Sequence, residues 1–389
     1  MRKIRVCHIT TAHSALDDRI FHKECRSLAE SGYEVILIAR HGQNKTIDGV
    51  KILALRPAGG LLSRIFFTST RTLLLALSQR AHIYHFHDPE FLLFAPLLKL
   101  LTKGKLIYDV HENYGKQIQN KFYLPAPSRR VIAFLTRGIE LLTSYFFDGI
   151  VTATEDIAGI FKRYKYTLCI KNYPVASYFK NGCEFKKNGR PGQDGKKGFD
   201  LIYAGEISEQ RWLCEVVESM EYVDGAKLFL YGGVQSPAFL ARLGELNGFK
   251  KVQYLGKVTH EEVVSQLEKY DAGIVCLRPI PNYVTALPVK MFEYMAAGIP
   301  VIASNFNLWA GIIERNRCGI CVDPLNPKAI AGAIKYLMDH LGTARQMGEN
   351  GRKAHLREYN WDGEKQKMLK MYKDILDGRN QATGKRRSG

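Results

Sequence analysis

Short apolar runs alternate with amphipathic stretches along most of the chain, which is typical of βαβ units on a parallel sheet. In the first half, such runs predict strands near residues 4–10, 35–39, 83–87, 105–110 and 149–153. Between the first two, Phe21, Cys25 and Leu28 recur at helical spacing, and Gly32 follows as a helix stop. We therefore expect a doubly wound, Rossmann-like α/β domain over residues 1–175.

A second series of strands and helices begins after a polar, glycine-rich segment, residues 176–199, which we interpret as a linker or loop. Strands are predicted near residues 200–204, 226–231, 251–255, 272–276, 300–303 and 319–322. They indicate a second doubly wound domain over residues 200–360. A last helix at about 361–378 could pack back on the first domain, and residues 379–389 are expected to form a disordered basic tail. Because ligands of open parallel sheets bind beyond the carboxyl ends of the strands, we expect a site in a cleft between the two domains.

Composition narrows the class of protein. Hydrophobic residues make up 46% and charged residues 24% of the chain, as in ordinary folded soluble proteins. The most apolar segments, near 61–77 and 91–101, are interrupted by Arg64, Arg71 and Lys99, so neither predicts a membrane-spanning helix. Met1 leads directly into a strand pattern without a signal-peptide pattern, and we expect a cytoplasmic protein.

The formal net charge of +18 favours a polyanionic partner, which leaves nucleic acid, anionic lipid and phosphorylated substrates as alternatives. No helix-turn-helix, zinc-finger or aromatic RNA-binding pattern is present in the sequence. A basic, Leu- and Phe-rich segment, residues 61–80, instead suggests a peripheral contact with an anionic membrane, although the same pattern fits an inward-facing helix.

The stretch from Asn282 to Ser304 is the most informative in the chain. Pro288 is favoured in the first turn of a helix, and Gly298 is a plausible stop. The first N–H groups of this helix and the Lys290 ammonium would then suit a phosphate, and Glu293, on the same face, could accept hydrogen bonds from ribose hydroxyls. The alternative is a solvated Lys290–Glu293 pair on an ordinary amphipathic helix.

Residues 288–304, Pro-Val-Lys-Met-Phe-Glu-Tyr-Met-Ala-Ala-Gly-Ile-Pro-Val-Ile-Ala-Ser, resemble the donor-binding signature of glycosyltransferase family four, whose members have the two-domain GT-B fold. Similar motifs occur along nearly the whole chain: Asp18-Arg19-Ile20, His87-Asp88-Pro89-Glu90, Tyr108-Asp109-Val110-His111-Glu112, Tyr203-Ala204-Gly205, Arg211, Cys318-Gly319 and Tyr359-Asn360-Trp361. The resemblance implies two Rossmann-like domains facing across a cleft, transfer with retention of anomeric configuration, no metal or other cofactor, and a nucleotide sugar held mainly by the second domain.

On the donor side, the resemblance implies that Arg211 stabilises the departing diphosphate, and Lys290 is our candidate for the companion cation. Without the resemblance, Arg211 would fit a solvated face at a helix start. Glu293 carries over as the ribose contact, whereas Thr285 stands where the family often has a glutamate that touches the sugar. The candidates for nucleotide-sugar binding are Gly205, Lys257, Val258, Thr285, Leu287, Pro288, Val289 and Glu293.

In the first domain, His111 follows the strand 105–110, and the resemblance implies that it lies beside the donor sugar as a catalytic residue. A loop histidine bonded to the backbone is the alternative. The acceptor-side candidates are Asp18, Arg19, His87, Asp88 and Glu112. His85 and His87 alternate on one strand and offer two metal ligands on one face, but no third is recognisable, so no metal site is predicted.

Together these features predict a metal-independent, retaining glycosyltransferase of the type that builds bacterial surface polysaccharides. It would move a hexosyl-type sugar from a nucleotide diphosphate sugar to a glycan acceptor that we expect to be lipid-linked, with no nucleic-acid partner. A sugar-nucleotide epimerase of the same fold and a basic nucleic-acid-binding protein are the alternatives.

Overall fold

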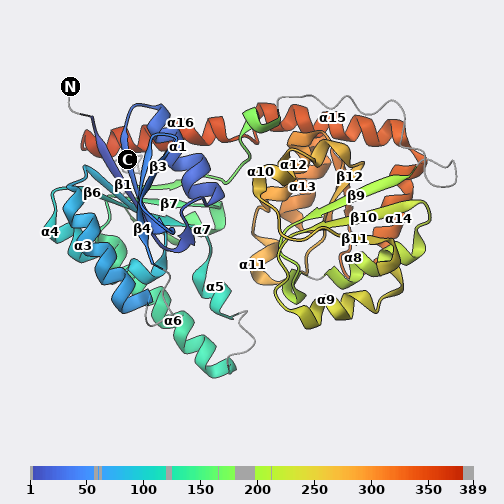
Figure 1. Cartoon of the computed structure of the whole chain (residues 1–389), viewed down its shortest axis with the longest axis horizontal. Coiled ribbons are helices and arrows are strands. Elements are labelled where there is room, and N and C mark those ends of the chain that lie inside the picture. The colour runs from blue at the N-terminus through green and yellow to red at the C-terminus, as the bar shows by residue number, and fades with distance from the viewer. Residues whose placement is uncertain are drawn as a thin grey trace, which may run out of the picture. The chain divides into compact units, whose positions relative to one another are not determined.

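The computed structural model describes residues 3–56, 60, 64–119, 125–164, 166–179, 198–211 and 213–379. The chain divides into two compact units (Figure 1). The first unit consists of Met1–Asn172 and Gly363–Gly389, and the second of Tyr173–Asp362. Most of the predicted linker, and the tail after Arg379, lie outside the described residues.

The first unit is built on an eight-stranded sheet with the order β3-β4-β2-β1-β5-β6-β7-β8. All neighbours are parallel except β3 and β4. Its strands are β1 (Arg5–Ser14), β2 (Glu34–Arg40), β3 (Lys45–Ile47), β4 (Val50–Leu55), β5 (Ile83–Phe86), β6 (Lys105–Val110), β7 (Gly149–Thr152) and β8 (Thr167–Cys169). The five strands expected from the apolar runs are all present, whereas the edge strands β3 and β8, and β4 beside β3, were not predicted.

Helices follow nearly every strand of this sheet. They are η1 (Asp18–Cys25), α1 (Arg26–Glu30), η2 (Arg64–Thr68), α3 (Ser69–Gln79), η3 (Pro89–Phe91), α4 (Ala95–Leu101), α5 (Tyr114–Gln119), α6 (Ala126–Thr143), η4 (Ser144–Phe146) and α7 (Glu155–Ile160). The predicted helix around Phe21 is η1 continued by α1. Asp17 caps its start by accepting hydrogen bonds from the N–H groups of Arg19 and Ile20, and Gly32 follows its end with a φ of 89°.

The last helix, α16 (Trp361–Leu376), packs on the first sheet. The methyl group of Met371 lies against Gly149 of β7, where an added Cβ would be 2.4 Å away. The hydroxyl of Tyr372 lies 2.7 Å from Nδ1 of His85 on β5. The first unit is therefore discontinuous in sequence, because the second unit is inserted before α16.

The second unit has a six-stranded, fully parallel sheet with the order β11-β10-β9-β12-β13-β14. Its strands are β9 (Phe199–Ala204), β10 (Ala226–Tyr231), β11 (Val252–Tyr254), β12 (Ala272–Val275), β13 (Val301–Ser304) and β14 (Gly319–Val322), which confirms all six predicted strands. The order reverses between β9 and β12, as in a doubly wound nucleotide-binding sheet.

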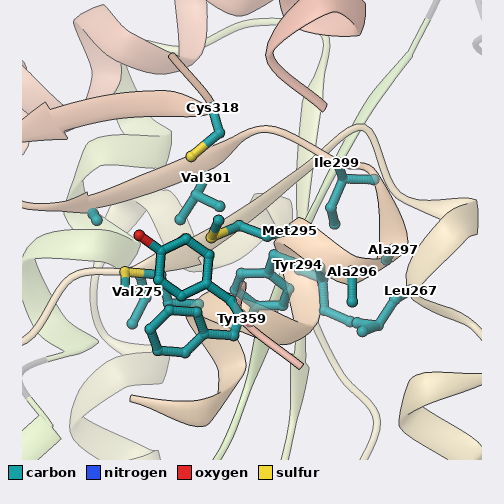
Figure 2. Close-up of a cluster of buried hydrophobic side chains, with 14 of the residues drawn as sticks. Leu267, Val275, Tyr294, Met295, Ala296, Ala297, Ile299, Val301, Cys318 and Tyr359 are labelled. Atoms are coloured by element: carbon teal, nitrogen blue, oxygen red, sulfur yellow. The ribbon is translucent and has the colours of Figure 1, made fainter. Parts of the chain in front are cut away.

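The helices of this unit are η5 (Ala176–Phe179), η6 (Glu209–Arg211), α8 (Leu213–Ser219), η7 (Met220–Tyr222), α9 (Pro237–Gly244), η8 (Asn247–Lys251), α10 (His260–Val264), η9 (Leu267–Lys269), α11 (Pro281–Val284), α12 (Val289–Ala297), α13 (Asn307–Asn316), α14 (Pro327–Asp339) and α15 (Leu341–Arg357). Among them, α12 is buried over nearly its whole length. Figure 2 shows Met295 of α12 in a core that also holds Val301 of β13, Cys318 and Tyr359.

A close approach between backbones fixes the position of α12. Gly348 of α15 lies over the end of α12, where an added Cβ would be 2.0 Å from the carbonyl oxygen of Gly298. Gly298 itself ends α12 with a φ of 74°. Because α12 contacts β12 and β13 as well as α15, the residues at its start have fixed positions.

Candidate active site

The carboxyl edge of the second sheet is lined by glycines. Gly205, Gly232 and Gly256 follow β9, β10 and β11, and their φ angles are 150°, 149° and 79°. A Cβ on Gly232 would lie 1.8 Å from the carbonyl oxygen of Gly205, so the two turns can stack only without side chains. This packing leaves backbone, rather than side chains, beside the start of α12.

Lys290 extends from the first turn of α12 over one of these glycines. Its Nζ would be 2.4 Å from a Cβ on Gly205, and it lies 3.7 Å from the ring centroid of Tyr203. Only 8% of Lys290 is exposed, and Nζ has no hydrogen-bond partner among the described residues. Burial, and then the charge of Arg211, lower the pKa of Lys290 well below its usual range, and Glu293 opposes them only in part. The ammonium thus lacks the anion that would stabilise it.

Arg211 supplies a second cation near Lys290. It ends η6, and its guanidinium lies 5.6 Å from the ring centroid of Tyr283. The buried Nε of Arg211 also has no acceptor in the part of the chain that the structure describes. Two neighbouring cations without a hydrogen-bonded carboxylate are suited to a doubly charged anion.

Glu293 lies one turn further along α12 and is 6% exposed. Its Oε1 is 2.5 Å from Nε2 of His260, the first residue of α10. The solvated Lys290–Glu293 pair considered from the sequence is wrong, because both side chains are buried and Lys290 Nζ makes no hydrogen bond to Glu293. His260 was not recognised in the sequence, since nothing in its local pattern relates it to α12.

The remaining donor-side candidates lie just before α12, in its first turn, or in the turn after β11. Pro288 precedes α12 in an extended conformation, so the N–H groups of Val289 and Lys290 have no intrahelical acceptor. Leu287 and Val258 are half-buried against the core, and Lys257 is exposed. The hydroxyl of Thr285 lies 3.4 Å from the carbonyl oxygen of Pro281.

In the first unit, His111 follows β6 and is held by Asp109. Nε2 of His111 lies 2.9 Å from Oδ2 of Asp109, which also lies 3.2 Å from Nδ1 of His87. Both carboxylate oxygens of Asp109 accept hydrogen bonds from Arg19, each at 3.0 Å. Although burial opposes it, Arg19 and then His111 hold the pKa of Asp109 well below its usual range. Since an ionised carboxylate can only accept, His111 donates from Nε2 to Asp109, and in a neutral imidazole Nδ1 is then the acceptor.

Asp109 was not among the predicted site residues. It alternates with His111 at the end of one strand, and this spacing was the signal for a shared position. Its partner Arg19 is 4% exposed, and His87 is fully buried. Of the predicted acceptor-side residues, the structure thus places Arg19 and His87 in the network that holds His111.

The other acceptor-side candidates have separate contacts. Oδ2 of Asp88 accepts hydrogen bonds from the hydroxyl of Thr10 and the N–H of Thr11, both at 2.6 Å, and Oδ1 lies 2.9 Å from Nδ1 of His13. Asp88 therefore fixes the end of β1. Nζ of Lys23 lies 2.6 Å from Oδ2 of Asp18. Glu112 is exposed, and its Oε2 accepts a hydrogen bond of 2.5 Å from Nε2 of Gln117.

Two family matches together span most of the chain. Residues 18–168 match the family described as Glycosyltransferase Family 4, and residues 185–354 match the family described as Glycosyl transferases group 1. The chain belongs to the family-four glycosyltransferases.

Similar proteins agree with this assignment. An uncharacterised glycosyltransferase of Methanocaldococcus jannaschii is 25% identical over 181 residues, which are 46% of this family-four glycosyltransferase and 45% of the relative. The chain thus spans about half the length of the curated relatives it matches. Sucrose-phosphate synthase of Thermosynechococcus elongatus has the same fold, with a TM-score of 0.78 at 16% identity over 97% of this chain and 100% of that one. Anabaena HepE, solved in complex with UDP and glucose, has a TM-score of 0.68 at 11% identity, over 95% of this chain and 99% of that one.

These likenesses confirm the GT-B fold, with two parallel α/β domains. Within the described parts of this family-four glycosyltransferase, no helix combines the length and the apolar character needed to cross a bilayer.

Proposed function

We propose that the protein transfers a hexosyl-type sugar, with retention of anomeric configuration, from a nucleotide diphosphate sugar to a glycan acceptor. One observation carries the proposal: Lys290 and Arg211 are two neighbouring cations with buried nitrogens that have no acceptor among the described residues, and Lys290 belongs to the first turn of α12. The complex of HepE with UDP and glucose supports a nucleotide-sugar donor on this fold.

The chemistry follows from where charge develops. When the bond between the anomeric carbon and the diphosphate oxygen breaks, negative charge collects on the phosphate oxygens. The Lys290 ammonium, the Arg211 guanidinium and the first N–H groups of α12 can stabilise this charge without rearranging at the moment of reaction. In our proposal these groups stabilise the diphosphate without a bound metal. When the nucleotide binds, Glu293 gives up its hydrogen bond with His260 and accepts hydrogen bonds from the hydroxyls of the ribose.

We assign His111 to the sugar. Because Asp109 fixes the Nε2–H form of His111, Nδ1 is an acceptor for a sugar hydroxyl, and it can hold the hexose in one orientation as the anomeric bond lengthens. In the proposal Glu112 and Asp18 contact the acceptor, and the buried Arg19, His87 and Asp88 act by holding the residues around them.

Calorimetric titration with a panel of nucleoside diphosphates tests the donor site. We expect Arg211→Ala and Lys290→Met each to weaken binding of the preferred diphosphate by about 1–3 kcal/mol, the usual range for loss of a charge-assisted hydrogen bond. Lys335→Met removes an exposed lysine of α14 and should leave affinity unchanged. Unchanged affinity in both site variants would refute the proposal.

Product analysis tests the reaction class. With the diphosphate sugar that corresponds to the preferred base, we expect labelled sugar to appear on an added glycan and free nucleoside diphosphate to be released. Conversion of the labelled donor into an isomeric nucleotide sugar, without release of the diphosphate, would instead assign an epimerase.

We also propose that the acceptor is lipid-linked and that the protein contacts the membrane where it builds surface polysaccharide. Within the segment 61–80 suggested by the sequence, Phe67 is 78% and Leu74 63% exposed. The helix α3 packs beside α4, where Leu100 is 71% exposed. Exposed Arg71 and Lys103 lie in the same stretches of chain, and a basic apolar surface of this kind suits an anionic leaflet.

Vesicle flotation tests this contact. We expect the protein to float with vesicles that contain phosphatidylglycerol, and the double variant Arg71→Glu with Lys103→Glu to float several-fold less. The double variant Lys335→Glu with Lys353→Glu, which makes the same change of charge at two exposed positions of the second unit, is the control. Flotation that responds neither to anionic lipid nor to the double variant would contradict the proposal.

A further inference from the structure

A second cluster of polar side chains lies within the first sheet and has no part in the proposed transfer, apart from one shared histidine. It consists of His8 on β1, Glu24 on η1, and His85 and His87 on β5. All four are at most 1% exposed. The sequence offered no third ligand beside His85 and His87, and this expectation is wrong. Because β1 pairs with β5, His8 lies directly opposite His85 in the sheet, and η1 adds Glu24.

The four side chains converge on one point. Oε2 of Glu24 lies 3.8 Å from Nδ1 of His8, 4.0 Å from Nδ1 of His85 and 4.0 Å from Nε2 of His87. Nδ1 of His8 lies 3.0 Å from Nε2 of His87. In a tetrahedral site with bonds of about 2.0–2.1 Å, the ligand atoms are about 3.3–3.4 Å apart, so the separations here lie on either side of the required value.

The orientation of the rings agrees with convergence. The centroids of the three imidazoles are 4.7, 4.8 and 5.2 Å apart. Rings that point their nitrogens at a common ion from tetrahedral directions are separated by about 5 Å, given the bond lengths of such sites.

Glu24 gives an independent indication. Neither of its carboxylate oxygens accepts a hydrogen bond from any described residue, although the side chain is buried. Oε1 lies 3.1 Å from Nε of Arg19, but Arg19 already donates two hydrogen bonds to Asp109. A buried carboxylate whose one neighbouring guanidinium is already hydrogen-bonded to Asp109 is incompletely compensated, and a proton or a second cation would supply what is missing.

Groups behind the cluster resemble those that orient metal-bound histidines. Nδ1 of His87 faces the carboxylate of Asp109 at 3.2 Å, and Nε2 of His8 faces the hydroxyl of Tyr372 at 3.2 Å. The same hydroxyl lies 2.7 Å from Nδ1 of His85, so His85 must give up this contact when its Nδ1 binds an ion, and Tyr372 is then left to His8. Such outer partners fix the ring and raise the basicity of the ligating nitrogen.

We propose that His8, Glu24, His85 and His87 bind one first-row divalent cation, with Zn²⁺ as the best match for three imidazoles and one carboxylate. With no open position and no exposed ligand, the site is structural: it joins β1, η1 and β5 beneath the Asp109–His111 pair. The proposal does not rest on the proposed transfer, because all the observations that support it lie within the first unit, although His87 also contacts Asp109.

The rival occupant is a proton on Glu24. Burial, and then the neighbouring Asp109 carboxylate, raise the pKa of Glu24 well above its usual range, so without a cation the carboxyl would be neutral. The two cases differ in metal content, which decides between them.

The first measurement is elemental analysis of the full chain, purified without a histidine tag. We expect about one zinc or similar ion per folded chain. Glu24→Gln keeps the shape of the side chain but removes its charge, and should lower the metal content at least tenfold. His340→Gln, which changes an exposed histidine of the second unit, should keep the full content.

A second measurement does not depend on a variant that folds. The unaltered chain, stripped with a strong chelator and loaded with Co²⁺, should show the visible d–d bands of tetrahedral cobalt. Added Zn²⁺ should also raise the melting temperature of the stripped chain, since an ion bound only by the native state stabilises it. A folded chain with less than about a tenth of an ion, no cobalt bands and no shift in melting temperature would overturn the proposal in favour of the proton.

Discussion

Single residues matter in this protein mainly through the partner that holds them. Asp109 decides which nitrogen of His111 donates, and His260 holds Glu293 while no ribose is bound. Lys290, Glu293 and Arg211 could be chosen from the sequence because helix signals and a family motif identify them locally. Asp109 could have been chosen from its spacing with His111, whereas His260 and Glu24 could not, since their partners lie on other strands and helices and only the fold brings them together.

At this scale we predict that His111→Ala lowers kcat more than it lowers nucleotide affinity. Loss of one hydrogen bond to the sugar should raise the activation free energy for kcat by about 1–3 kcal/mol. The contacts to the diphosphate lie in the other unit and should stay intact. Steady-state rates combined with calorimetry of the diphosphate separate the two effects, and His340→Ala is a matched control. A fall in diphosphate affinity equal to the fall in kcat would contradict the assignment of His111.

At the scale of elements, the sequence predicted the strands with clear apolar runs and the ends of α12, but not β3, β4 and β8 or the packing between helices. The apolar runs gave every strand of the second sheet, and Pro288 and Gly298 marked both ends of α12. The strands β3 and β8 have only three residues each, but so does β11, which was predicted, and the missed β4 has six, so strand length alone does not separate the predicted strands from the missed ones. The close contact of α15 with α12 was not predictable either, because it depends on a glycine whose neighbour is distant in sequence.

This contact gives a prediction with an internal control. Gly348→Ala would place a Cβ 2.0 Å from the carbonyl oxygen of Gly298, a backbone atom that cannot turn away, so α15 must move from α12. We expect a loss of about 2–4 kcal/mol of unfolding free energy, as in overpacked cores with backbone shifts. Gly342→Ala, in the same helix, meets no atom within 4 Å and should be neutral or stabilise by up to about 1 kcal/mol. Denaturant unfolding of both variants checks the difference, and equal stabilities would show that α15 packs differently.

For the whole molecule, the distinctive feature is that the first unit is made of two pieces of chain. Met368, Met371, Tyr372 and Ile375 of α16 are at most 1% exposed. Burying them contributes about 6–12 kcal/mol in total, which is comparable to the whole stability of a typical domain. The helix α16 is therefore a part of the first core, whereas the sequence indicated only that a last helix at about 361–378 could pack back on the first domain.

We predict that a chain ending at Asp362 loses the first unit and keeps the second. Hydrogen exchange should show fast exchange in β1, β5 and β6 and unchanged protection in β9, β12 and α12. A chain ending at Arg379 retains the whole of α16 and should match the full protein. Protection of β1 in the shorter chain would mean that the first sheet is stable without α16.

The same discontinuity sets the order of events on the ribosome. Residues of β1 leave the exit tunnel early, yet the helix that completes their core is synthesised only after all of Tyr173–Asp362. The inserted unit, which is continuous, can fold as soon as it emerges, whereas the nascent N-terminal segment must wait with its apolar strands incompletely covered. This reverses the usual N-terminal-first order of cotranslational folding, and it makes the early segment the part of the protein most in need of a chaperone.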